Sequence, residues 1–108
     1  MAEPPLRGID DVIHAKARLG IMSLVMSHSY CDFAMLKQKL DLTDGNLGSH
    51  ILKLEQAGYI LVEKTFVNRK PKTIISVTKV GALAYEDYIE ALEALIHARI
   101  SPQKKRKD

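Results

Sequence analysis

Hydrophobic residues recur every three or four positions through the first part of the chain, which is the period of an amphipathic α-helix. This pattern predicts a helix from Ile9 to about Ser27. Residues 1–8 contain two prolines and a glycine and are predicted to form a mobile N-terminal arm. The apolar face of the predicted helix consists of Ile13, Ala17, Ile21, Leu24 and Val25.

Two shorter helices are predicted after a break at residues 28–31. Asp32 is a suitable N-cap for a helix from Phe33 to Leu40, and Thr43 for a helix from Asp44 to about Ala57. Gly58 follows and is well placed to end the second of these helices. Because only a very short turn separates them, the two helices form a helix-turn-helix candidate. Their predicted inward-facing residues are Phe33, Leu36 and Leu40 in the first helix, and Leu47, Ile51 and Leu54 in the second.

The hydrophobic period changes after Gly58. Residues 59–67 and 72–77 are rich in β-branched and aromatic residues, which predicts a β-hairpin linked by residues 68–71. Thr78 then caps a long helix from Lys79 to Ile100, and residues 101–108 are predicted to be a basic flexible tail. This order predicts one mainly α domain with a β-hairpin (α+β) over residues 9–100. It is a winged helix-turn-helix with long N- and C-terminal dimerisation helices.

The distribution of charge suggests a polyanionic partner. Residues 37–79 carry eight basic and four acidic side chains, whereas residues 80–100 carry one basic and four acidic side chains. Such segregation is typical of one face that binds nucleic acid. The single cysteine, Cys31, excludes a disulfide within the chain and favours a reducing compartment. Without a secretory signal or an apolar run of about 18 residues, a cytoplasmic protein with no membrane partner is expected.

Residues 42–60 resemble the recognition-helix signature of compact archaeal and bacterial winged-helix regulators, the ArsR/MarR-like group. The stretch reads LTDGNLGSHILKLEQAGYI, and residues 13–22 resemble the first-helix motif of that group. Residues 68–73 and 77–81 resemble its wing and the start of its last helix. The resemblance covers about residues 9–96. It implies a homodimer that binds double-stranded DNA and regulates transcription.

A helix that enters the major groove needs one apolar face on the scaffold and short polar side chains on the other. Asn46, His50 and Lys53 share one stripe of the predicted helix, with Gly45 and Ser49 beside it. They are predicted to contact DNA, although they could instead only solvate an amphipathic helix.

Two further positions stay open on this helix. His50 could be a scaffold residue bonded to the backbone. Leu52 occupies a position that is usually polar in the family, and it could contact a thymine methyl group or pack on the scaffold.

The predicted hairpin is rich in positive charge. Arg69 and Lys70 lie in the predicted link, and Lys72 follows it. Such a tip can contact phosphates or enter a narrow minor groove. An edge hairpin also carries lysines to discourage aggregation, so Lys64 and Lys79 suit either role.

The last helix is apolar over more of its length than a small domain requires. This stripe predicts pairing with the same helix of a second subunit, although it could pack entirely within one subunit. The predicted dimerisation residues are Tyr85, Tyr88, Ile89, Leu92, Leu95 and Ile96.

Neither a metal nor another cofactor is expected, and no arrangement of residues suggests an enzyme. Four scattered histidines have no spacing typical of zinc ligands. Glu93 and His97 lie one helical turn apart, which is typical of a surface pair. A small-molecule effector is possible, but no residue supports one.

The sequence therefore predicts a homodimeric transcriptional regulator that binds specific double-stranded DNA. Two alternatives remain. One is a winged-helix module that binds protein within a larger assembly, which Leu52 and the acidic Asp44 favour. The other is an architectural DNA binder with little sequence preference, which the weakly charged recognition helix and the basic tail favour.

Overall fold

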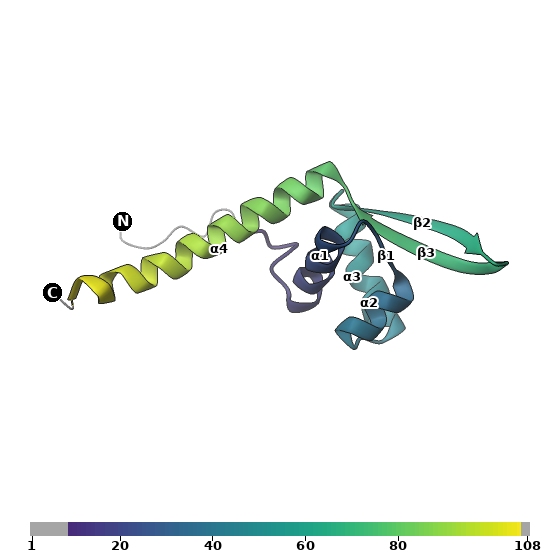
Figure 1. Cartoon of the computed structure of the whole chain (residues 1–108), viewed down its shortest axis with the longest axis horizontal. Helices are drawn as coiled ribbons and strands as arrows, with labels where there is room; N and C mark the ends of the chain where they lie inside the picture. Colours follow the sequence, from purple (N-terminus) through teal and green to yellow (C-terminus); the bar gives the residue numbers. More distant parts are fainter. Residues whose placement is uncertain (1–8, 107–108) are drawn as a thin grey trace.

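The computed structural model describes the backbone of residues 9–106 and the side chains of residues 9–97. This part of the chain contains four helices and a three-stranded sheet, in an α+β arrangement (Figure 1). The predicted arm and the end of the predicted tail, residues 107–108, lie outside the described residues. The elements are α1 (Lys16–Ser27), β1 (Cys31–Asp32), α2 (Phe33–Leu40), α3 (Asp44–Gln56), β2 (Ile60–Val67), β3 (Lys70–Val77) and α4 (Lys79–Arg106).

The sheet is antiparallel, with β3 between β1 and β2. The strands β2 and β3 form the predicted hairpin, whose register runs from Ile60 opposite Val77 to Val67 opposite Lys70. The two-residue strand β1 was not predicted from the sequence. It exists because Cys31 lies opposite Ile75, more than forty residues away, and no local pattern reports such a pairing.

The tip of the hairpin is tighter than the sequence pattern predicts. Its turn consists of Asn68 and Arg69 alone, and both residues have positive φ angles, of 52° and 68°. Positive φ angles at both central residues are typical of a type I′ turn, whose twist matches the right-handed twist of the two strands it connects. Lys70 and Pro71 therefore belong to β3, not to the link. Pro71 lies opposite Phe66 at a pair that exchanges no ladder hydrogen bonds, so its missing N–H is tolerated.

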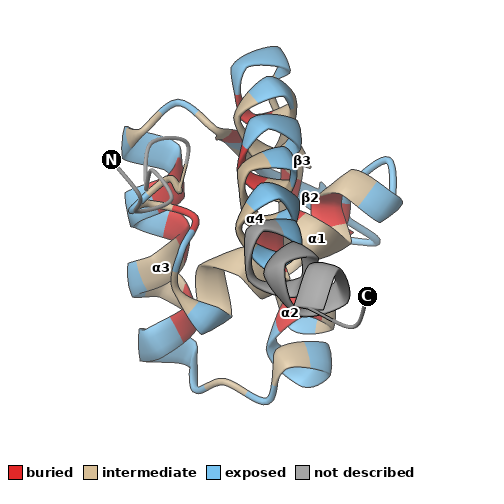
Figure 2. Ribbon diagram, turned by 90° about the vertical axis from the view of Figure 1, so that its left-hand side faces the viewer, coloured by how far each residue is buried: buried red, intermediate tan, exposed pale blue. Residues whose placement is uncertain are grey.

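The core lies between α1, α2, α3, the base of the hairpin and the first half of α4 (Figure 2). The predicted inner face of α3 is confirmed, because its three apolar residues are buried. Leu36 is the buried residue of α2, with Phe33 and Leu40 packed partly against the core. The buried residues are Ile13, Ile21, Met22, Val25, Cys31, Leu36, Leu47, Ile51, Leu54, Ile60, Ile75 and Tyr88.

The predicted N-caps are confirmed. The carboxylate of Asp32 accepts a hydrogen bond from Met35 N at 2.7 Å, and the hydroxyl of Thr43 accepts one from Asn46 N at 3.1 Å. The hydroxyl of Thr78 accepts one from Gly81 N at 2.9 Å. Each bond satisfies a backbone donor that a helix start otherwise leaves without a partner.

The first helix is shorter than predicted, since it begins at Lys16 instead of Ile9. The carboxylate of Asp10 accepts hydrogen bonds from Val12 N at 2.8 Å and from the hydroxyl of Tyr59. An aspartate that bonds nearby backbone in this way forms a turn in place of a helix. A long N-terminal dimerisation helix is therefore not present in the described chain. Ile13 is still buried, but it reaches the core from this turn.

The last helix is longer than predicted, because it continues through Ser101 and Pro102 to Arg106. A proline inside a helix removes one backbone hydrogen bond and crowds the preceding turn, which favours a helix end, whereas the basic residues beyond it suit the C-terminal end of a helix dipole. At its start α4 packs tightly on the segment that precedes β2: a β-carbon added to Gly81 would lie 2.0 Å from the carbonyl oxygen of Tyr59. The helix then leaves the core, opposite the hairpin (Figure 1). The molecule is elongated for this reason, with a radius of gyration of 17.1 Å, against about 13 Å for a compact chain of this length.

Candidate nucleic-acid interface

The helices α2 and α3 form a helix-turn-helix with a short, well-defined turn. Asp41 adopts a left-handed conformation, with φ of 54°, and Leu42 N donates to the carbonyl of Lys37 at 3.2 Å. Because the inner side of α3 is buried, its opposite side faces solvent. The predicted recognition helix is therefore anchored and exposed in the manner that groove binding requires.

Four of the five α3 residues predicted to contact DNA lie on this outer face. The side chains of Asn46, Ser49 and Lys53 are exposed, and a β-carbon added to Gly45 would have no atom within 4 Å. Leu52 is also exposed, by 51%, so it does not pack on the scaffold. Gln56, which the sequence reasoning missed, is exposed on the same face. The spacing 45, 49, 52, 56 was the signal that could have identified it.

His50 differs from its neighbours because it is attached to the scaffold. It lies at the border of the outer face, half-buried, and its Nδ1 accepts a hydrogen bond from Nη1 of Arg18 at 3.1 Å. A guanidinium can only donate, so this contact requires an unprotonated Nδ1. Burial lowers the pKa of His50, and the charges of Arg18 and Lys53 lower it further. At neutral pH His50 is an uncharged side chain that links α3 to α1.

The acidic residue at the start of α3 has a basic partner. Lys37 of α2 lies 2.9 Å from the carboxylate of Asp44, and both side chains are largely exposed. An exposed pair of this kind adds little stability. It does balance the negative charge of Asp44, which would otherwise repel a phosphate approaching the helix.

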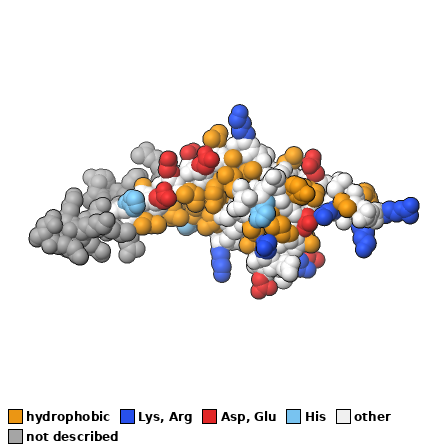
Figure 3. Space-filling view, in the orientation of Figure 1, with side chains coloured by type: hydrophobic (Ala, Val, Ile, Leu, Met, Phe, Trp, Pro, Cys, Tyr) orange, Lys and Arg blue, Asp and Glu red, His pale blue; other side chains and the backbone are white. Residues whose placement is uncertain are grey.

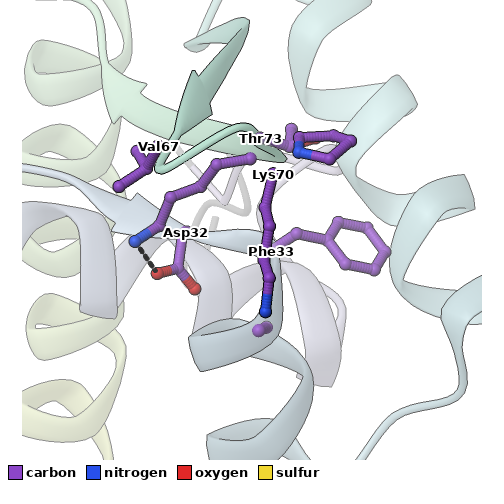
Figure 4. A pocket seen from close by; sticks show the side chains of 8 residues that line it. Asp32, Phe33, Val67, Lys70 and Thr73 are labelled. Carbon is purple, nitrogen blue, oxygen red and sulfur yellow. Dashed lines mark ion pairs between the residues drawn. The ribbon is translucent and has the colours of Figure 1, made fainter.

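The hairpin forms a wing that projects from the sheet, with basic side chains at its tip (Figure 3). Arg69 and Lys70 are exposed there, as is Lys64 on β2. Lys72 is placed differently, because its ammonium lies 3.4 Å from the carboxylate of Asp32 (Figure 4). Of the three predicted wing contacts, Arg69 and Lys70 are presented to solvent and Lys72 forms an ion pair with the scaffold.

An open groove of about 500 Å³ separates the wing from the start of α2 (Figure 4). Four of its eight lining residues are apolar, and the Lys72–Asp32 ion pair forms part of its wall. This pair joins the outer part of the wing, two residue pairs from its tip, to the N-cap of α2. The lining residues are Asp32, Phe33, Ala34, Val67, Lys70, Pro71, Lys72 and Thr73.

The predicted dimerisation stripe of α4 has two parts: its first residues pack within the same subunit, and its last two are more exposed. Tyr88 is buried and its hydroxyl lies 2.8 Å from Nδ1 of His14, while the hydroxyl of Tyr85 lies 2.9 Å from that of Ser23. Burial raises the pKa of Tyr88, and so does Tyr85. Ile89 and Leu92 pack against the core of the same subunit. The residues beyond them are more open: Leu95 is half-buried and Ile96 is 48% exposed.

The cysteine and the possible metal ligands of the described chain form no reactive site. Cys31 is buried, and burial together with the nearby Asp32 raises the pKa of its thiol. Within residues 9–97, no group of three or more histidine, cysteine or acidic side chains could hold a metal ion. No helix of the described chain is long and apolar enough to span a membrane.

A family model described as a winged helix DNA-binding domain matches residues 17–96. The chain belongs to this winged-helix DNA-binding family. The match covers the helix-turn-helix, the wing and the first part of α4, and it confirms the resemblance inferred from residues 42–60. This family binds DNA and is not an enzyme family.

Two archaeal proteins are similar in sequence. The uncharacterized protein MJ0432 of Methanocaldococcus jannaschii is 40% identical over 78 residues, which cover 72% of this chain and 85% of that protein. A structure of the transcriptional regulator homologue protein from Pyrococcus horikoshii OT3 has a TM-score of 0.74 and 33% identity, over 79% of this chain and 84% of that chain.

Similarity of fold alone extends to more distant regulators. The ArsR family transcriptional regulator RHA00566 has a TM-score of 0.55 and 19% identity, over 90% of this chain and 97% of that chain. The structural neighbours are regulators of the ArsR/MarR group, as the recognition-helix resemblance implied.

Proposed function

We propose that this protein is a homodimeric transcriptional regulator of the cytoplasm that binds specific sequences of double-stranded DNA. The observation that carries the proposal is the outer face of α3. It combines exposed Asn46, Ser49 and Lys53 with the bare position at Gly45, on a helix whose other side is buried. The missing side chain of Gly45 allows the backbone to approach base edges, and an asparagine amide can pair with adenine.

The wing supports the same function through a different contact. Arg69 and Lys70 lie at the end of the hairpin, which extends away from the core. In this proposal a duplex docked on α3 comes within reach of that tip. They contact phosphates or enter the minor groove, and so add affinity that tolerates changes of sequence. The ion pair of Lys72 with Asp32 gives this lysine the lesser role of holding the wing.

The dimer forms through the outer half of α4. This half extends beyond the core of its own subunit and carries Leu95 and Ile96 with their apolar surface partly open. A second copy would cover this surface by a symmetric contact. Two copies also double the DNA contacts, which compensates for a recognition helix with few basic residues.

Selection of duplexes from a random DNA pool by the full-length protein tests the proposal. We expect a two-fold related sequence with half-sites about 10–10.5 base pairs apart, or a multiple of that spacing. Asn46→Ala should weaken binding of the selected duplex by about 1–3 kcal/mol per half-site and leave random-sequence binding nearly unchanged. Uniform enrichment would indicate an architectural DNA binder. Absence of DNA binding by the folded dimer would favour the protein-binding module.

A further inference from the structure

The proposed reading face of α3 contains one large apolar side chain. Leu52 is 51% exposed and does not belong to the set of side chains that pack against the core. A single exposed leucine is ordinary on a protein surface. Its position is not ordinary, because Gly45, Ser49 and Gln56 lie on the same stripe, seven and three residues before it and four residues after it.

We propose that Leu52 is a specificity-determining residue that contacts the C5-methyl group of a thymine in the major groove. This inference rests on the proposed function, and it assigns one base pair of the bound sequence to one side chain. The distance along the helix fits the contact: Leu52 lies seven residues, about 10 Å, beyond Gly45. The major groove is about 12 Å wide, so a helix that enters at Gly45 carries Leu52 into the groove.

The chemistry of the groove selects thymine as the partner. The thymine methyl is the apolar group that a standard base presents on the major-groove edge, and the other edge groups are hydrogen-bond donors or acceptors. A leucine against the donor of cytosine or adenine would leave that group without a partner, which is costly once water is excluded. Leu52 thus favours thymine and disfavours cytosine at one position of each half-site.

The neighbouring residues permit this contact. Gly45 has no side chain and Ser49 has a short one, so neither holds the helix away from the bases. Leu52 is then the bulkiest apolar group on the stripe and meets the base edge first. Gln56, one turn further along, supplies an amide for the adjacent base pair or phosphate.

Single replacements of thymine by deoxyuridine in the selected duplex test the proposal, since they remove only the methyl group. We expect one thymine per half-site at which uracil weakens binding by the full-length wild type about fourfold, the equivalent of one methyl group removed from water. Leu52→Ala should bind the thymine duplex more weakly and should not distinguish thymine from uracil there. Its melting temperature should stay close to that of the wild type, because Leu52 does not pack against the core.

Leu61→Ala is the matched control, because Leu61 is 50% exposed and lies on β2, outside the reading face. It should keep the full discrimination between thymine and uracil. A wild type indifferent to every uracil, or a Leu52→Ala protein that keeps the same discrimination, overturns the role of Leu52 while the proposed function stands. If no sequence is selected at all, both the proposed function and this role of Leu52 fail.

Discussion

Gly45 and Gly48 of α3 both occupy positions where a β-carbon would find no atom within 4 Å. Neither glycine is required by packing or by a positive φ angle, and each lowers the helix propensity of α3. Their places on the helix differ, because Gly45 lies near the centre of the outer face and Gly48 on its flank. Comparing substitutions at the two glycines therefore tests whether the missing side chain of Gly45 serves contact with DNA, with Gly48 as the control.

Gly45→Ala is expected to raise the free energy of unfolding, by up to about 1 kcal/mol, and to weaken DNA binding. The added methyl group stabilises the helix but holds it away from the base edges. Urea denaturation and DNA titration measure the two effects. Gly48→Ala should give a similar gain in stability with little change in affinity. Equal DNA affinity of Gly45→Ala and the wild type would contradict the proposed approach.

His50 is expected to make stability depend on pH. Its folded-state pKa lies below the usual value, so the unfolded chain binds a proton more readily than the folded chain does. The stability due to neutral His50 is fully present above pH 6.5, and it is lost as the pH falls from there toward the lowered pKa. Melting temperatures between pH 8 and pH 5 measure this loss.

His50→Asn is the matched variant, because the asparagine carbonyl can accept the bond from Arg18 but does not titrate. It should lose less stability than the wild type over the same range of pH. Equal losses in the two proteins would show that the titration of His50 does not affect folding.

At the scale of elements, the basic residues of the wing differ in whether they have an acidic partner. Arg69 and Lys70 are exposed to solvent, whereas Lys72 pairs with Asp32. Arg69→Ala with Lys70→Ala should weaken binding to all duplexes about equally. Each lost phosphate contact should reduce the slope of log affinity against log salt by about one. Salt titrations with a selected and a random duplex measure both effects. Lys72→Ala should change the slope less, because its ammonium already pairs with Asp32. A double variant with an unchanged slope would exclude phosphate contact by the wing tip.

Elements set by neighbouring residues were predictable, and elements set by distant partners were not. The caps of α2, α3 and α4 follow from one side chain and the backbone three residues later, so the sequence pattern located them. The turn before α1 combines local bonds from Val12 N and Ile13 N to Asp10 with a long-range contact of Asp10 with Tyr59, and β1 depends on its pairing with β3. Both long-range partners lie more than forty residues away, beyond the reach of any local period.

At the scale of the whole molecule, the outer half of α4 is the proposed dimer interface. Leu95→Glu with Ile96→Glu should convert the dimer to a monomer and weaken DNA binding, because charges would be buried at the interface. Leu92 is unsuitable for this test, since it packs against its own core. Sedimentation at micromolar concentration measures the association. Leu61→Glu on the sheet should remain dimeric. A wild type that is monomeric at every concentration would contradict the proposal.

The sequence by itself determined the winged-helix order of elements, the buried face of α3 and the polar residues opposite it. These follow from a local period, because each buried leucine or isoleucine forces its neighbours at other angles to face solvent. Only the tertiary structure decided which of the residues predicted to contact DNA or a second subunit are free to do so. Arg18 holds His50, Asp32 pairs with Lys72, and the core takes Tyr88 out of the apolar stripe of α4. Those assignments depend on groups brought together from distant parts of the chain, and a helical or strand period contains no information about them.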